Sequence, residues 1–391
     1  MSICAKAERL WKSKKAGIAR LDLMIKIRDA LHGNVSLTSL EEEVLDSWHM
    51  QRLRGIRQLA AAYLVYPGAN HTRFEHSIGT LALADRICKE LELDGERTQM
   101  VRLAALLHDV GHVCFSHEAE YVLAKHIGTH EEIGKKIMLK SEIADIIGKQ
   151  FSARKIAYLC DQPLGKIISS DIGADRMDYL LRDSHYTGVA YGVIDADRIT
   201  SCLEFSGKQL VLQERGLEAA ESLLVARYTM FFTVYLHKTV RIANRMIQEG
   251  ISAAIKEGGL EPEAALEMTD AQMLHALLQI KGSRKYAESI MKRKLYKKAF
   301  SSGRLELAGM QQELEEHLSN TCGCEVLLDF PSIKLGSSIN VKCSDGLVPL
   351  SECSQLVASL EKIQRLEALV ICPKQYVKKV AKEAEALFSR I

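Results

Sequence analysis

Proline is scarce in this sequence. Only 6 of its 391 residues are proline, about 1.5%, whereas proteins average near 5%. Because proline interrupts the interior of a helix, its scarcity favours a chain built mainly of helices.

Long apolar runs and an excess of one charge are also missing. The sequence has no run of 18 apolar residues, which a membrane-spanning helix needs. Its basic start, with Arg9 and Lys12, lacks the apolar core of a signal peptide. The 52 basic and 50 acidic residues leave a net charge of +2, so overall charge favours neither nucleic acid nor a membrane as a partner. We therefore expect a cytoplasmic protein that does not bind membranes.

The ten cysteines form no CxxC pair and show no regular spacing. This arrangement favours reduced thiols over a disulfide framework. The hydrophobic fraction of 47% and the charged fraction of 26% are typical of a globular protein and exclude a disordered or fibrous chain. A chain of this length can bury a full core and predicts two or three domains.

Apolar residues recur at helical spacing through most of the chain. After a short predicted strand at residues 24–28, the pattern predicts helices at 41–62, 75–91, 97–108, 117–127, 130–139, 165–183, 216–256, 270–279, 283–300 and 304–318. Strand-like segments then follow at 325–330, 339–342 and 368–372, with helical patterns at 352–365 and 373–390. The predicted fold is mostly α, with a helical domain over residues 1–319 and a small α+β domain over residues 320–391.

Histidines are concentrated in one stretch. Seven of the thirteen lie between residues 71 and 130: His71, His76, His108, His112, His117, His126 and His130. Neutral imidazole and ionised carboxylate are common nitrogen and oxygen ligands of metals. Because carboxylates accompany these histidines, the stretch predicts a metal site.

A second polar pattern lies in the predicted helix at 165–183. Steps of 100° per residue place Asp175, Arg176, Tyr179 and Asp183 within one arc of about 100°. A helix that only supports the fold seldom has four polar groups on one stripe, so this stripe is expected to line a cleft.

Three motifs together resemble the H…HD…D signature of the HD-domain metal-dependent phosphohydrolases. They are Arg73–His76, the segment His108–His117, which begins with His-Asp, and Asp175–Tyr179. Within this superfamily the sequence resembles the deoxynucleoside-triphosphate triphosphohydrolases, which include an enzyme with an added sterile-alpha-motif domain. The resemblance runs from about residue 25 to residue 298, and its motif-bearing core is at about 25–240. The sterile-alpha-motif domain is absent, and the C-terminal part matches loosely. The resemblance implies an HD-domain helical core.

The resemblance implies one divalent metal held by His76, His108, Asp109 and Asp175. Two imidazoles and two carboxylates suit Mn²⁺, Fe²⁺, Co²⁺ or Ni²⁺, and Zn²⁺ remains open. Mg²⁺ prefers oxygen ligands, so it is expected only together with the phosphates of the substrate.

The resemblance also implies roles for the residues around this metal. His112, His117 and His130 surround the reacting phosphorus, with His117 as general acid and Glu120 or Glu131 orienting the histidines. Each histidine has an alternative role in fixing a metal ligand. The residues implied in substrate binding are Arg73, Arg176 and Arg227 for the phosphates, and Gln58, Leu59, Tyr179, Asp183 and Tyr235 for the sugar. Phe231 and Phe232 depart from the family pattern, where polar and basic residues are usual.

The function implied is hydrolysis of a deoxynucleoside triphosphate to deoxynucleoside and triphosphate. One alternative is another nucleotide phosphatase or a phosphodiesterase on the same metal site, against which Gln58, Asp183 and Tyr235 argue. An alternative of another class is a regulator that binds nucleotide or nucleic acid without turnover.

A basic run lies at residues 281–298, with eight basic residues and one acidic residue. A solvated helix face, a nucleic-acid contact and a nucleotide effector site all remain open for it. The resemblance implies a nucleotide effector held between subunits of a homo-oligomer, a dimer or tetramer. The residues implied are Asp46, Gln51, Arg54, Arg293 and Lys297, and the alternative is that they make structural ion pairs within one subunit.

Overall fold

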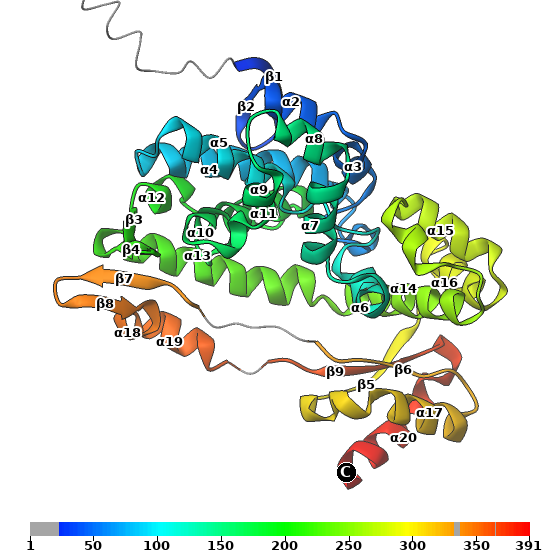
Figure 1. Ribbon diagram of the computed structural model, residues 1–391. Coiled ribbons are helices and arrows are strands. Elements are labelled where there is room, and N and C mark those ends of the chain that lie inside the picture. Colours follow the sequence, from blue (N-terminus) through cyan, green and yellow to red (C-terminus); the bar gives the residue numbers. More distant parts are fainter. Residues whose placement is uncertain (1–22, 332–336, 364) are drawn as a thin grey trace, which may run out of the picture.

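The computed structural model describes residues 23–331, 337–363 and 365–391. The basic start of the chain lies outside these residues. The fold is mostly α, as predicted, with a helical body above two small sheets (Figure 1). Across the described ranges, every helix is too short or too polar to span a lipid bilayer.

The described chain begins with an antiparallel hairpin of β1 (Leu23–Asp29) and β2 (Gly33–Thr38). Helices follow without another strand until residue 203. They are α2 (Ser39–Leu45), α3 (Trp48–Arg52), α4 (Arg73–Glu90), α5 (Gly95–Leu107), α6 (His117–Ile127), α7 (His130–Lys140), α8 (Glu142–Gly148), α9 (Ala153–Ala157), α10 (Lys166–Ser169), α11 (Ala174–Thr187) and α12 (Ala196–Thr200).

The second half alternates helices with short strands. Its elements are β3 (Leu203–Ser206), β4 (Gln209–Gln213), α13 (Leu217–Met230), α14 (Lys238–Lys256), α15 (Asp270–Gln279), α16 (Lys281–Met291), β5 (Lys297–Ser302), α17 (Gln311–Cys322), β6 (Leu327–Asp329), β7 (Asn340–Cys343), β8 (Gly346–Pro349), α18 (Leu350–Cys353), α19 (Gln355–Glu361), β9 (Ala368–Cys372) and α20 (Val377–Arg390).

Each sheet of the second half combines strands from before and after residue 320. One sheet has the order β3-β4-β7-β8, in which β4 and β7 run parallel with Leu212 opposite Val341. The other has the order β5-β9-β6, with antiparallel neighbours. The segment after residue 320 therefore contacts the helical body at two places, below α13 and below α14 (Figure 1). The predicted domain boundary at 320 stays a prediction.

Two adjoining apolar cores hold the helices together. The first includes Leu81, Leu106, Leu180 and Leu223, from α4, α5, α11 and α13. The second includes Leu123, Met246, Leu277 and Ile290, from α6, α14, α15 and α16. Gly79 lets α4 and α11 come close, because a Cβ there would lie 2.0 Å from Asp178 Oδ1. The metal-ligand motifs of α4 and α11 are thereby brought together.

The prediction of one long helix at 216–256 is wrong. A π-helical turn over Phe231–Tyr235 follows α13, and α14 begins only at Lys238, with the side chain of His237 accepting a hydrogen bond from the Thr239 N–H. The sequence has no proline or glycine near the break. The helical spacing of apolar residues therefore continues through the break and does not predict it. Turns of this kind are frequent at functional sites.

Other boundaries also differ from the prediction. The single helix expected at 41–62 is two helices, α2 and α3, and α3 ends at residue 52. Residues 297–302 form β5 instead of helix, and α17 begins at residue 311 instead of 304. The prediction at 165–183 missed the break between α10 and α11, and the elements missed altogether are α8, α9, α12, β2, β3, β4 and β8. The three C-terminal strands predicted are present as β6, β7 and β9.

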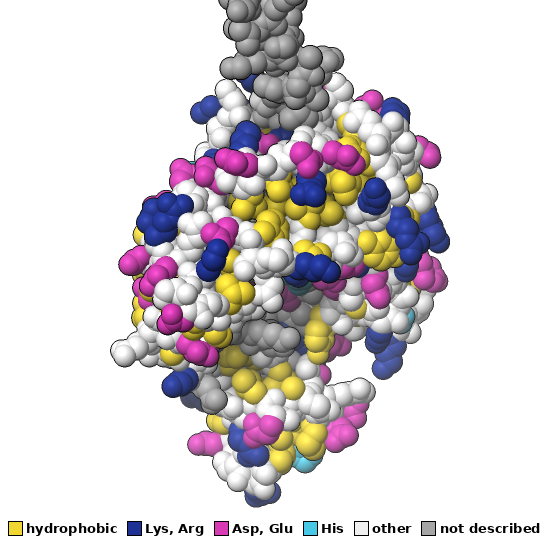
Figure 2. Space-filling model, turned by 60° about the vertical axis from the view of Figure 1, so that its left-hand side comes forward, with side chains coloured by type: hydrophobic (Ala, Val, Ile, Leu, Met, Phe, Trp, Pro, Cys, Tyr) yellow, Lys and Arg dark blue, Asp and Glu magenta, His cyan; other side chains and the backbone are white. Residues whose placement is uncertain are grey.

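Charge is distributed evenly over the face shown in Figure 2, where basic and acidic side chains are interspersed. This agrees with the net charge of +2. The face has no large patch of side chains of one charge.

Candidate metal centre and active site

The four expected metal ligands come together from three segments of the chain. His76 lies on α4, His108 and Asp109 directly follow α5, and Asp175 lies in the first turn of α11. The Nε2 atom of His76 is 3.1 Å from Asp175 Oδ1 and 3.7 Å from Asp109 Oδ2. The Nε2 atom of His108 is 3.3 Å from Asp109 Oδ1 and 3.7 Å from Asp175 Oδ1.

The other ring nitrogen of each imidazole is already engaged. Nδ1 of His76 bonds to Asp178 Oδ2 at 2.7 Å, and Nδ1 of His108 bonds to the Ala105 carbonyl at 2.8 Å. A carbonyl or carboxylate oxygen accepts only, so each Nδ1 holds the hydrogen and each Nε2 presents a lone pair to the centre. This is the orientation that a metal-binding histidine needs.

The charges of this centre also fit a cation. Burial alone would lower the pKa of His76, but hydrogen bonds to Asp175 and Asp178 outweigh it and raise the pKa to about 10, so these carboxylates favour a positive charge at Nε2, where a metal ion would replace the proton. Although burial opposes it, the charge of Arg73 and the neighbouring histidines hold the pKa of Asp109 well below its usual range. Two carboxylates and two imidazoles with Nε2 towards the centre therefore favour a positive charge between them, which a divalent transition metal would supply.

A buried network behind the centre was missed by the sequence reasoning. Asp178 accepts hydrogen bonds from His76, from His32 at 2.6 Å, and from Arg182 at 2.8 and 3.0 Å. Arg182 also bonds to Asp29 at 3.0 Å. His32 and Asp29 lie far from the motifs in sequence, and their local sequence does not indicate that they belong to this site.

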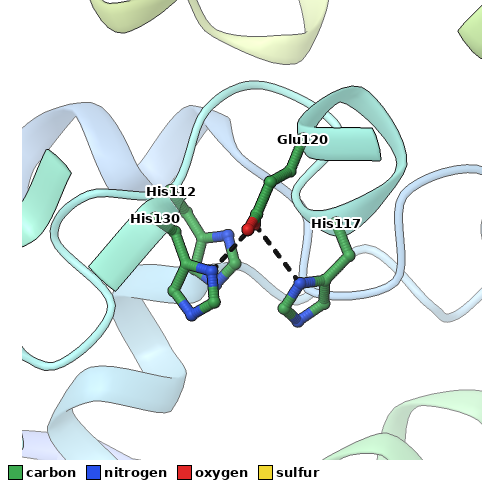
Figure 3. A group of neighbouring side chains, drawn as sticks. All are labelled: His112, His117, Glu120 and His130. Carbon is green, nitrogen blue, oxygen red and sulfur yellow. Dashed lines mark hydrogen bonds and ion pairs between the residues drawn. The ribbon is translucent and has the colours of Figure 1, made fainter. Parts of the chain in front are cut away.

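The expected catalytic residues form a second cluster next to the first (Figure 3). The rings of His112 and His130 stack with centroids 4.1 Å apart, and His117 stands edge-on to both. Glu120 Oε2 lies 2.8 Å from Nδ1 of His130 and 3.5 Å from Nδ1 of His117. Glu131 is more distant, 3.7 Å from His130 Nε2. The geometry thus favours Glu120 as the carboxylate that orients the two histidines.

The same cluster contains histidines of different charge. Burial, reinforced by the positive charge of Arg73, lowers the pKa of His112 well below its usual value. Burial also acts to lower the pKa of His130, but the hydrogen bond to Glu120 dominates and raises it. At neutral pH the site therefore combines a neutral imidazole with a more basic one.

The loop that presents His117 is held in an unusual backbone conformation. Phe115 and Ser116 have φ angles of +58° and +53°, a region that residues other than glycine seldom adopt. Asp270 accepts the Phe115 N–H at 2.8 Å, and the Ser116 hydroxyl donates to the Arg57 carbonyl at 3.1 Å. Such strain persists only where surrounding contacts determine it, and it is concentrated at functional sites.

Close packing also brings His112 to His130. A Cβ on Gly111 would lie 2.1 Å from the His130 carbonyl oxygen, so only glycine allows the loop to approach the start of α7. Arg52 fixes the same loop by donating to the His112 carbonyl at 2.6 Å. Neither Arg52 nor Asp270 was singled out from the sequence, because both act through backbone groups far away in the chain.

A cavity of about 880 Å³ joins the two clusters to the expected sugar site. Its wall includes these expected substrate residues: Gln58, Leu59, Arg73, Tyr179, Asp183 and Tyr235. The Tyr235 hydroxyl donates to Asp183 Oδ2 at 2.7 Å, and His71 bonds to Asp183 Oδ1 at 2.7 Å. The π-helical turn before α14 thus directs Tyr235 towards α11 and into the cavity.

The three arginines expected at the phosphates are all engaged with carboxylates. Arg73 donates to Asp109 Oδ2 at 2.6 Å and to Ser116 Oγ at 2.9 Å. Arg176 pairs with Asp171, and Arg227 Nη1 lies 3.6 Å from the same carboxylate. Arg176 and Arg227 are thus brought together at Asp171, beside the lining residues of the cavity.

The expected effector residues are not gathered at the cavity, and all five lie outside its wall in the described structure. Arg54 donates to the side chain of Gln51 at 2.9 Å, beside Asp46 at the end of α2. Arg293 donates to the Leu64 carbonyl at 2.9 Å, and Lys297 is exposed at the start of β5.

Comparison with known proteins places these features in a family. Residues 73–183 match the model of the HD domain, and residues 194–389 match that of the HD-associated region. The chain belongs to the HD-domain phosphohydrolase family. All four expected metal ligands lie within the stretch that matches the HD domain.

Three relatives show how far the similarity extends. “Uncharacterized protein MJ1154” of Methanocaldococcus jannaschii is 36% identical over 377 residues, 90% of this chain and 80% of that protein. The structure of a hypothetical protein from Aquifex aeolicus matches with a TM-score of 0.80 and 32% identity, covering 92% of this chain and 99% of that chain. The “Deoxynucleoside triphosphate triphosphohydrolase SAMHD1 homolog” of Dictyostelium discoideum is 28% identical over 305 residues, 69% of this chain and 59% of that protein.

Proposed function

We propose that this HD-domain protein hydrolyses deoxynucleoside triphosphates to deoxynucleoside and triphosphate. The observation that carries the proposal is the continuous cavity between the metal-ligand cluster and the pair of Tyr235 and Asp183. A nucleotide in this cavity would place phosphates at one end and sugar at the other. The name of the Dictyostelium discoideum relative supports the same reaction.

His76, His108, Asp109 and Asp175 would hold the divalent metal. A divalent ion there supplies Lewis-acid polarisation of the reacting phosphate and of the attacking water. We assign the general-acid role to His117, which lines the cavity and is oriented through Nδ1 by Glu120. Water adds to the phosphorus next to the sugar, the bond from phosphorus to the 5′ oxygen breaks, and His117 protonates that oxygen.

The sugar end predicts a preference for deoxyribose. The Tyr235 side chain closes this part of the wall, and both oxygens of Asp183 already accept hydrogen bonds. A ribose 2′-hydroxyl would lack a partner there, at a cost of about 1–3 kcal/mol. We expect kcat/KM for deoxyribose substrates to exceed that for ribose substrates by a factor of about ten or more.

A turnover screen tests the proposal. The four deoxynucleoside triphosphates and their ribose analogues are incubated with the protein and either Mn²⁺ or Mg²⁺, and products are identified by phosphorus NMR. Triphosphate as product supports the proposed reaction, whereas orthophosphate would indicate another nucleotide phosphatase. Equal rates on dGTP and GTP would refute the sugar assignment. Binding of single-stranded RNA without any turnover would indicate a regulator.

We further propose that the protein forms a homo-oligomer that a nucleotide effector stabilises. The candidate residues are Asp46, Gln51, Arg54, Arg293 and Lys297, and they lie away from the cavity. Arg293, between α16 and β5, and Lys297, at the start of β5, carry positive charge that suits a triphosphate. Sedimentation velocity with and without GTP or dGTP, together with initial rates over substrate concentration, tests this. A monomer with hyperbolic kinetics that ignores added nucleotide would show that these residues are structural.

A further inference from the structure

The end of the cavity beyond the sugar site has a compact polar group of its own. It consists of Glu118, directly after His117 on α6, and of Asn244 and Gln248, one turn apart on α14. All three line the cavity. The Asn244 amide donates to Glu118 Oε1 at 2.8 Å, and the Gln248 amide donates to Glu118 Oε2 at 2.8 Å.

This group has hydrogen-bond acceptors to spare and no positive charge. Among the described residues, no cation pairs with Glu118, because Arg241 is bound to Asp329 and Arg245 to Glu249 and Glu315. Gln248 is only 9% exposed, and its side-chain oxygen accepts no hydrogen bond within the described part of the chain. A carboxylate accepts about four hydrogen bonds and donates none. When Glu118 is ionised, the unfilled capacity at this end therefore consists of acceptors.

Burial of this carboxyl group is unfavourable unless something donates to it. Burial raises the pKa of Glu118 to about 7, and the charge of Asp329 adds to the effect. A buried acidic group without a cation costs stability. Its presence in the wall of a cavity is explained more readily by a ligand that donates hydrogen bonds to it than by the fold.

The group lies close to the expected sugar site. The helix α14 begins just after Tyr235, and Val240, Asn244 and Gln248 line the cavity on successive turns. At 1.5 Å per residue this stripe extends roughly 12 Å from the sugar end. Asn244 also accepts the Ala61 N–H at 3.4 Å, and Ala61 follows the sugar-site segment of Gln58 and Leu59 by two residues. The group thus adjoins the sugar site from two sides.

We propose that Glu118, Asn244 and Gln248 form a base-recognition subsite that favours guanine, an inference that rests on the proposed nucleotide substrate. Guanine presents two adjacent donors on one edge, N1–H and the 2-amino group. Adenine and cytosine present an amino donor beside a ring-nitrogen acceptor, and thymine presents one N–H between two carbonyls. Acceptors facing acceptors repel, so a carboxylate beside an amide oxygen matches the guanine edge best.

Steady-state rates on the four deoxynucleoside triphosphates test the subsite. In the unaltered protein, kcat/KM for dGTP should exceed that for the other three by about tenfold or more, the discrimination expected of a two-donor contact. Glu118→Gln keeps the shape of the side chain but replaces an acceptor with a donor. It should remove most of this preference, measured as the ratio of kcat/KM for dGTP to that for each other substrate, while the metal content stays within a factor of about two. Glu263→Gln, at an exposed glutamate, is the matched control and should keep the preference.

Equilibrium binding separates this inference from the proposed reaction. Calorimetric titration of the full chain with dGMP, dAMP, dCMP and dTMP measures base preference whichever phosphate bond is cut. Tighter binding of dGMP that is lost in Glu118→Gln supports the subsite, and equal binding of all four overturns it even if every triphosphate is hydrolysed. Turnover of no nucleotide refutes the proposed function instead. If Glu118→Gln does not fold, Gln248→Leu replaces it, because it removes the amide oxygen and one of the two hydrogen bonds that orient Glu118.

Discussion

The two ends of the cavity are built differently. At the proposed metal end, three of the four candidate ligands are fixed by a further partner: His76 by Asp178, His108 by the Ala105 carbonyl, and Asp109 by Arg73. At the far end, the partners of Glu118 within the described residues are neutral amides, and these residues leave part of its hydrogen-bonding capacity unused.

This difference matches what each end is proposed to bind. A metal ion needs ligands at fixed distances and with the correct ring nitrogen presented, so the protein supplies every other hydrogen bond itself. A recognition surface needs groups that are oriented but still unfilled, because a ligand must complete them. Metal binding should therefore weaken when any hydrogen-bond partner of a ligand is removed. Base recognition at the far end should weaken mainly when a hydrogen-bond acceptor is removed.

The largest effect is expected at a metal ligand itself. Asp109→Ala should abolish turnover and leave the purified protein without bound metal, because the variant lacks an anionic ligand while Arg73 keeps its positive charge at the site. Elemental analysis measures the metal, and circular dichroism checks the fold. Asp145→Ala, at an exposed aspartate of α8, is the control. Stoichiometric metal in purified Asp109→Ala would contradict the ligand assignment.

An intermediate effect is expected at Asp178, which forms a hydrogen bond with the candidate ligand His76. Asp178→Asn keeps the size of the side chain but weakens its hold on His76, so metal affinity should fall by about 10–100-fold. Turnover should then recover at high metal concentration, which a direct catalytic role for Asp178 would not allow. Metal titration against a chelator measures the affinity, with Asp145→Asn as the control. An unchanged affinity would show that the orientation of His76 does not depend on Asp178.

The smallest effect is expected at the far end and concerns stability. The folded-state pKa of Glu118 is about 7, above its ordinary value of 4.5, so folding favours the protonated form. The stability of the unaltered protein should therefore fall relative to that of Glu118→Gln as the pH rises from about 4.5 to 7. The difference should reach roughly 1–3 kcal/mol above pH 7. Urea unfolding at pH 5 and pH 8 measures it, and parallel curves at both pH values would contradict the burial of an ionisable group here.

The metal end was predictable because its ligands lie in short motifs. His76, His108, Asp109 and Asp175 stand at or near helix ends, and two of them are adjacent in sequence. The histidine cluster suggested a metal site, and the resemblance to the HD-domain motifs implied these four ligands. The residues at the far end gave no such signal, since Glu118 is one of many glutamates on a helix and its partners lie 126 and 130 residues away.

The sequence by itself determined that the chain is mostly helical and that histidines and aspartates lie in motifs typical of a metal site, because scarce proline, apolar periodicity and short motifs are local properties. Only the tertiary structure decided where α13 ends, how the turn at Tyr235 brings its hydroxyl to Asp183, and which buried groups have no donor among the described residues. These features depend on packing between α4, α6, α11 and α14. The spacing of residues within one segment does not reveal which distant segment packs against it.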